Sequence, residues 1–280
     1  MPEPRIVTLD LDGVRTALAW AAAEGWNPGR ADAEPFLAAD PDGFLAVTVD
    51  GRIAVTASVV RWSDTFAFGG LFIADPEHRR AGLGNLLLEA ALAAAGDRTV
   101  GLDAVLEQEP RYARLGFAPA YTTTRWTLPD GVVVPPPEAE TVEARELAFD
   151  ALVEYDARCV AAARPAFLAA WLAVPGADAR VVVSHGGIVG WGMRRPCAEG
   201  AKIGPLFADD PDVAELLWRA LTHGRPGPVQ IDAPDPNASA QEIVRRHGLV
   251  PGFTTRRMYL GPPPEFDLGR VVGVTTLELG

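Results

Sequence analysis

The chain has 280 residues, a net charge of −12, and 48% hydrophobic against 22% charged residues. This composition is enough to bury a core, which excludes a largely disordered protein, and the length allows one large domain or two small ones. No apolar run reaches the ~20 residues of a membrane span, Met1–Arg5 lacks the features of a signal peptide, and two cysteines are too few for a disulfide framework. We therefore expect a cytoplasmic protein without a membrane partner. The acidic balance also argues against nucleic acid as a partner.

The first half of the chain alternates short apolar strands with helices. In chain order we expect a helix at residues 14–24, a hairpin with strands at 44–49 and 53–62, a strand at 66–73, a helix at 85–95, a strand at 99–106, a short helix at 111–115 and a strand at 120–128. Residues 129–140 contain three consecutive prolines, which cannot continue a helix or a central strand, so this segment is expected to be a linker.

The second half repeats the scheme. We expect helices at residues 145–162, 165–172, 211–221 and 239–247, and strands at 179–184, 188–194, 229–233, 253–259 and 266–279. Because hairpins precede the helices, the predicted fold class is α/β (α+β), with a mixed, mostly antiparallel twisted sheet in each half.

Three pairs of similar segments indicate that the halves arose by duplication. Residues 114–128 and 246–260 share seven of fifteen residues at an offset of 132, and 71–76 and 206–211 share four of six at an offset of 135. Residues 50–53 and 185–188 form a third pair at the same offset of 135. Chance explains any one pair, but three in the same order favour a duplicated domain.

The loop from Arg79 to Gly84 and the helix after it predict an anion site. A helix N-terminus leaves about four backbone N–H groups unpaired and carries about half a positive charge. Gly82 and Gly84 lack Cβ atoms, so a large anion can lie against the backbone, and Arg79 and Arg80 add positive charge. The loop has neither the Gly-Lys-Ser/Thr of a P-loop nor the third glycine of a dinucleotide fingerprint. On this loop alone, a helix with a flexible entry and no ligand remains the alternative.

Two motifs of the first half resemble the GNAT acetyltransferase superfamily. The family's cofactor motif, Arg/Gln-x-x-Gly-x-Gly/Ala after a bulged strand, is matched by Arg79-Arg-Ala-Gly-Leu-Gly84. The second motif, Tyr followed by Gly-Phe after three residues, is matched by Tyr112-Ala-Arg-Leu-Gly-Phe117. The layout resembles tandem-GNAT proteins over nearly the whole chain. The resemblance implies a catalytic GNAT-like domain at 1–128 and a degenerate one at 141–280.

The resemblance implies acetyl-CoA, or another acyl-CoA, as donor, and no metal. The backbone of Phe72, Ile73 and Ala74 would pair with the pantetheine arm like an added strand. A bulge in that strand would free an N–H to polarise the thioester carbonyl. An acceptor amine would attack directly, in agreement with a sequence that lacks an obvious nucleophile. The pyrophosphate would be held by a loop made of Arg79, Arg80, Ala81, Gly82, Leu83 and Gly84.

Proton transfer needs an acid and a base. By analogy with the family tyrosine, Tyr112 would protonate the leaving CoA thiolate; the alternative is a packing aromatic. The amine must lose a proton, because an unperturbed alkylamine is charged at pH 7. Asp103 interrupts an apolar run at residues 100–106, where a carboxylate has either a hydrogen-bond partner or a function. It is our first candidate base, followed by Glu107 and Glu109, and water could relay the proton instead.

The acceptor site is defined less sharply by the sequence. Trp26 and Trp62 flank segments that line it in the family, and Glu109 and Asp156 are further candidate contacts, although each could be an ordinary packing or surface residue. In the second half, Leu217 and Arg219 stand opposite Gly82 and Gly84, so this half should not bind CoA in the same way.

We therefore expect an N-acetyltransferase, monomeric or homodimeric, that acts on a primary amine of a small molecule or peptide. One alternative is a non-catalytic acyl-CoA sensor or scaffold. The other is a protein whose second half is the functional binding module for a protein partner.

Overall fold

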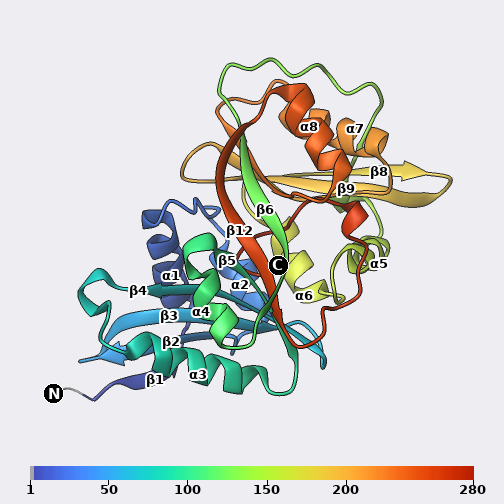
Figure 1. Ribbon diagram of the computed structural model, residues 1–280. Helices are drawn as coiled ribbons and strands as arrows, with labels where there is room; N and C mark the ends of the chain where they lie inside the picture. Colours follow the sequence, from blue (N-terminus) through green and yellow to red (C-terminus); the bar gives the residue numbers. More distant parts are fainter. Residues whose placement is uncertain (1–2) are drawn as a thin grey trace.

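A computed structural model describes residues 3–280, which fold around one sheet of 13 strands (Figure 1). From edge to edge the order is β1-β2-β3-β4-β5-β12-β6-β11-β10-β9-β8-β7, and β13 pairs with β10. The strands of the first half are β1 (Arg5–Thr8), β2 (Phe44–Val49), β3 (Arg52–Arg61), β4 (Phe66–Ala74), β5 (Thr99–Val105) and β6 (Ala118–Leu128). Those of the second half are β7 (Val142–Glu143), β8 (Asp178–Ser184), β9 (Gly187–Pro196), β10 (Ala201–Ala208), β11 (Val229–Pro234), β12 (Val250–Leu260) and β13 (Val271–Gly273).

Within residues 3–280, the helices divide between the two halves in equal numbers. They are α1 (Leu11–Ala23), α2 (Ala33–Ala39), α3 (Leu83–Ala95), α4 (Glu109–Arg114), α5 (Phe149–Cys159), α6 (Pro165–Leu172), α7 (Pro211–Thr222) and α8 (Ala238–His247). Short 3₁₀ turns lie at η1 (Pro76–His78), η2 (Leu106–Gln108), η3 (Ala144–Glu146) and η4 (Leu268–Arg270). None of the helices in residues 3–280 combines the length and apolar character that crossing a bilayer requires.

The two halves exchange their last long strands. β12 of the second half lies between β5 and β6, and β6 of the first half lies between β12 and β11. β6 and β12, which hold the most similar pair of segments, run antiparallel side by side through the centre of the molecule (Figure 1). The hydroxyls of Thr124 and Thr254 are 3.0 Å apart across this pair. The domain boundaries 1–128 and 141–280 therefore remain a prediction about the duplicated units. The strands of both units belong to one continuous sheet.

The main core also spans both halves. Helices α1 and α2 pack with α5 and α6 in one buried cluster. Within it, the rings of Phe36 and Trp171 stack at 6.4 Å, and those of Phe167 and Trp171 at 5.0 Å. Two further clusters lie under α3 and under α7 with α8. In α3, burial of Leu87, Ala91 and Ala95 follows the one-turn spacing that its sequence predicts.

The α/β fold with two tandem halves is confirmed, and several expected elements form close to their predicted bounds. The hairpin β2–β3 turns through Asp50 and Gly51, whose φ values of 51° and 75° suit a tight two-residue turn. The helix observed in the range 145–162 is shorter than expected, because η3 precedes α5 and Val160 adopts an extended backbone conformation. The prediction of a strand at 266–279 was wrong over most of that range: only β13 forms, and η4 precedes it.

Candidate active site

A cavity of about 710 Å³ lies beside β4, β5 and α3. Ten of the residues predicted for the site line it: Trp26, Phe72, Ile73, Ala74, Arg79, Arg80, Gly82, Gly84, Asp103 and Tyr112. Six others do not: Ala81 and Leu83 within the loop, and Trp62, Glu107, Glu109 and Asp156 elsewhere. The structure thus brings together the strand, the glycine loop and the tyrosine, and leaves out most of the proposed acceptor contacts.

The cavity exists because β4 and β5 separate. They pair in parallel from Phe66 with Thr99 to Gly69 with Leu102, where the register ends. Beyond this point β4 continues from Gly70 to Ala74 with β3 on one side and the cavity on the other. This edge therefore presents main-chain N–H and C=O groups to whatever fills the cavity.

A bulge lies at the point of separation. Between Gly70 and Ile73, β4 has one residue more than β3, and Leu71 adopts a left-handed φ of 47°. The Thr56 hydroxyl donates a 2.9 Å hydrogen bond to the Leu71 carbonyl and fixes this conformation. The expected bulge is thus present, and it lies in the wall of the cavity.

The N-terminus of α3 opens onto the same space. Gly82 is its N-cap with a φ of 81°, and no side chain caps the first turn. The first N–H groups of the helix are therefore available to an anion. A Cβ on Gly84 would lie 3.1 Å from the ring tip of Phe72, so a side chain there would crowd the cavity wall.

Three arginines surround this end of the cavity. Arg79 pairs with Glu24 after α1, and its Nε donates to the Ala74 carbonyl at 3.2 Å. Arg111 was missed by the sequence analysis: its guanidinium lies 4.8 Å from the centre of the Phe72 ring and donates to Asn85 at 2.9 Å. With Arg80 they give the entrance a positive charge, although the whole chain is acidic.

Tyr112 lies on α4 with its ring edge-on to Phe117, 5.7 Å between centres. Burial raises the pKa of the Tyr112 phenol above its ordinary value, and the nearby Arg111 only partly offsets this effect. A raised pKa keeps the phenol protonated at neutral pH, which is the form that a proton donor needs. The packing and the catalytic interpretations of Tyr112 are therefore compatible.

Asp103 has the hydrogen-bond partner that its position requires. Both of its carboxylate oxygens accept hydrogen bonds from Arg257 of β12, each at 2.8 Å. The same pair recurs in the second half, where Arg125 of β6 donates to Asp232 of β11 at 2.6 and 2.8 Å. The second half has this pair although it lacks the glycine loop, so the pair is not tied to the candidate site. This observation weighs against Asp103 as the base, and the role of Asp103 stays an untested prediction.

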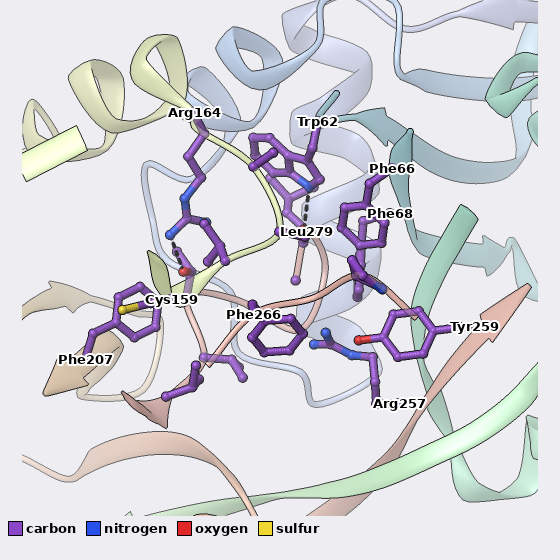
Figure 2. A pocket seen from close by; sticks show the side chains of 18 of the residues that line it. Trp62, Phe66, Phe68, Cys159, Arg164, Phe207, Arg257, Tyr259, Phe266 and Leu279 are labelled. Carbon is purple, nitrogen blue, oxygen red and sulfur yellow. Dashed lines mark hydrogen bonds between the residues drawn. The ribbon is translucent and has the colours of Figure 1, made fainter. Parts of the chain in front are cut away.

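The remaining predicted contacts lie elsewhere. Glu109 accepts a 3.3 Å hydrogen bond from Arg256. Trp62 lines a second, smaller cavity of about 40 Å³, and Figure 2 shows it there with several other aromatic rings and Arg164. Asp156 pairs with Arg164 at 2.7 and 3.0 Å and is fully buried. Trp62 and Asp156 thus both lie near Arg164, outside the large cavity that Tyr112 lines.

The second half contributes residues to the large cavity that the sequence analysis did not find. They are Phe253 and Thr255 of β12, and Leu277 and Glu278 of the segment after β13. Glu278 had the same signal as Asp103, a lone carboxylate in an apolar run, but its run was interpreted as a strand. Its neighbours at the cavity are distant in sequence, so no local pattern could have placed it.

The equivalent opening in the second half is filled. β10 and β11 pair in parallel from Ala201 to Ile203, as β4 and β5 do, and then separate. Here β13 occupies the space and pairs with β10 through Leu206 and Phe207. At the start of α7, Asp210 accepts 2.9 Å hydrogen bonds from the N–H groups of Asp212 and Val213.

Comparisons with known proteins agree with this architecture. Two family models described as acetyltransferase (GNAT) domains match residues 40–119 and 152–273. A holothin acyltransferase from a Pseudoalteromonas strain is 30% identical over 264 residues, which cover 93% of this chain and 89% of that protein. A putative acetyltransferase from Pyrococcus horikoshii has a TM-score of 0.83 at 22% identity, covering 99% of this chain and 96% of that one. A tandem GNAT protein from the clavulanic acid biosynthesis pathway has a TM-score of 0.62 at 17% identity, covering 93% and 100%.

Proposed function

The chain belongs to the GNAT acetyltransferase family and is an acyltransferase, and we propose that it moves an acetyl group from acetyl-CoA to a primary amine of a small molecule or peptide. The observation that carries this proposal is the cavity at the β4–β5 separation, which joins an open strand edge, an uncapped helix N-terminus and Tyr112. No other region of residues 3–280 combines these three features with a large cavity.

The donor fits this cavity by the chemistry of its parts. The pyrophosphate would lie at the first turn of α3, held by N–H groups from Arg80 to Gly84 and by the charges of Arg79 and Arg111. The pantetheine amides would pair with the open edge of β4 at residues 72–74. The residues present therefore suit an elongated, anionic thioester, and the cavity of about 710 Å³ is wide enough to hold part of it.

Bound acetyl-CoA would supply a thioester that a neutral amine can attack directly. The bulge at Gly70–Leu71 would direct a main-chain N–H at the thioester oxygen and stabilise its developing charge. Tyr112, kept protonated by burial, would donate its proton to the departing sulfur. Attack without a covalent enzyme intermediate agrees with the buried thiols. Burial raises the pKa of Cys159 to about 12, and it also raises the pKa of Cys197 above its ordinary value, which disfavours nucleophilic thiolates.

A two-stage measurement tests this function against the acyl-CoA sensor. Calorimetry with acetyl-CoA tests donor binding, and thiol release with a panel of primary amines tests turnover. We expect binding, amine-dependent thiol release, and a loss of about 10²-fold in kcat for Tyr112→Phe with little change in acetyl-CoA affinity. Binding without amine-dependent release would favour the sensor. Absence of binding would contradict both functions.

A further inference from the structure

One side chain at the large cavity lacks a role in the scheme above. Glu278 is only 3% exposed and lines the same cavity as Tyr112. Within residues 3–280 its carboxylate has no hydrogen-bond partner. Its oxygens are not completely buried, and the residue lines the cavity. A buried carboxylate left without hydrogen bonds is unfavourable, so an open one at a cavity wall is suited to a ligand.

Glu278 is held next to the bulge of β4. A Cβ on Gly70 would lie 2.1 Å from the Glu278 carbonyl oxygen, so the two backbones are in contact and only glycine fits there. Leu71, the next residue of β4, carries the left-handed conformation of the bulge. Glu278 therefore lies against the strand segment where the thioester carbonyl is expected.

The segment that carries Glu278 is fixed on both sides. Arg164 donates a 2.7 Å hydrogen bond to the Thr275 hydroxyl. The Trp62 indole donates to the Leu279 carbonyl at 2.9 Å, as Figure 2 shows, and the Leu279 N–H donates to the Thr276 hydroxyl at 3.0 Å. Anchoring on each side limits the positions that Glu278 can adopt, as a catalytic group requires.

Three buried cations lie near Glu278 without donating hydrogen bonds to its oxygens. They are Arg125 of β6, Arg195 of β9 and Lys202 of β10. Arg125 is paired with Asp232, Arg195 donates to Asp32 at 3.0 Å, and Lys202 lies 3.8 Å from Asp232. Their hydrogen bonds go to these aspartates and to main-chain oxygens, which leaves the Glu278 carboxylate free to accept from a ligand.

From these contacts we propose that Glu278 binds the ammonium group of the acceptor and removes the proton that prevents its attack. This inference rests on the proposed function and offers Glu278 as the base in place of Asp103, whose carboxylate is held by Arg257. It also gives the second half a direct part in catalysis. The aromatic rings of Trp26 and Phe253 line the same cavity, so the acceptor is an amine attached to an apolar or aromatic body.

The acceptor ammonium gives one proton to the Glu278 carboxylate, and the freed lone pair forms the C–N bond to the thioester carbonyl carbon. The C–S bond breaks with its electron pair on sulfur, which takes the Tyr112 proton. The nitrogen loses its second proton to the Tyr112 phenolate, and Glu278 releases its proton to solvent. Both residues return to their starting forms, with amide, CoA thiol and one proton as products.

Glu278→Gln in the full chain tests this role, with benzylamine, tryptamine and histamine as probes. At pH 7 we expect about 10²-fold lower kcat with unchanged acetyl-CoA affinity. The deficit should shrink as the pH rises toward the amine's own pKa, because solvent then deprotonates the acceptor. Glu278→Asp, which keeps the carboxylate, should retain part of the activity with the wild-type pH profile. Glu265→Gln removes an exposed carboxylate between β12 and η4 and serves as the control.

The outcomes separate the two proposals. If Glu278→Gln turns over as fast as wild type, or shows a deficit that is constant with pH, the role of Glu278 is wrong and the acetyltransferase stands. If wild type binds acetyl-CoA but releases no thiol with any of the three amines, both proposals fall. Because the pH dependence is compared within one variant, a simple loss of folded protein cannot imitate the expected result.

Discussion

The two halves contain the same opening in a parallel strand pair, and they use it differently. In the first half, β4 and β5 separate around a large cavity, and α3 begins with the uncapped Gly82. In the second half, β10 and β11 separate around β13, and Asp210 caps α7. In the second half, β13 thus occupies the space between the separated strands. In the first half, an extended ligand would occupy the corresponding space.

Under the proposed function, this difference explains how one duplicated fold serves both ligand binding and structural support. An open strand edge and an uncapped helix leave polar backbone groups in need of partners, which a ligand can provide. When β13 and Asp210 provide them, the same elements become structural. The segment that follows β13 contacts Gly70 of β4, and this contact places Glu278 at the cavity of the first half.

The largest effect is expected when the open helix start is blocked. Gly82→Glu introduces a negative side chain at a residue with a φ of 81°, at the proposed phosphate site, and should abolish acetyl-CoA binding in calorimetry. Gly186→Glu is the matched control, since Gly186 has a φ of 80° and open space around it in the β8–β9 turn. Equal affinities in the two variants would contradict the site assignment.

A smaller effect, on stability, should be shared by both halves. Asp103→Asn and Asp232→Asn each leave a buried arginine without its carboxylate, and each should lower the free energy of unfolding by about 3–5 kcal/mol in denaturant titrations. Turnover per folded molecule should be similar in the two variants. A selective loss of turnover in Asp103→Asn would restore Asp103 as the base and break the equivalence of the two pairs.

The smallest effect concerns the capped helix. Asp210→Ala removes the side chain that accepts from Asp212 and Val213, and should lower the free energy of unfolding by about 0.5–2 kcal/mol. Acetyl-CoA affinity, measured by calorimetry, should stay at the wild-type value. Weaker binding in this variant would mean that the second half takes part in donor recognition.

Local sequence patterns were sufficient for most elements and for the family. The tight turn at Asp50-Gly51, the amphipathic α3 and the prolines of the linker act through near neighbours, so their signals survive in a short window. The same holds for the loop from Arg79 to Gly84 and for Tyr112, which identified the GNAT family. Segments stabilised by distant partners were harder: β13 pairs with β10, and the chain beyond it follows the shape of the space that it fills.

By itself, the sequence determined the family, the duplicated α/β fold and the loss of the glycine loop in the second copy, and it predicted where the candidate donor site lies. Tertiary structure alone decided that β6 and β12 change places, that Asp103 pairs with Arg257, that β13 closes the second opening, and that Glu278 lies beside the bulge of β4. The physical reason is separation along the chain: Asp103 and Arg257 are 154 residues apart, and Arg125 and Asp232 are 107 apart. Such pairings depend on the geometry of the whole sheet, which no local pattern contains.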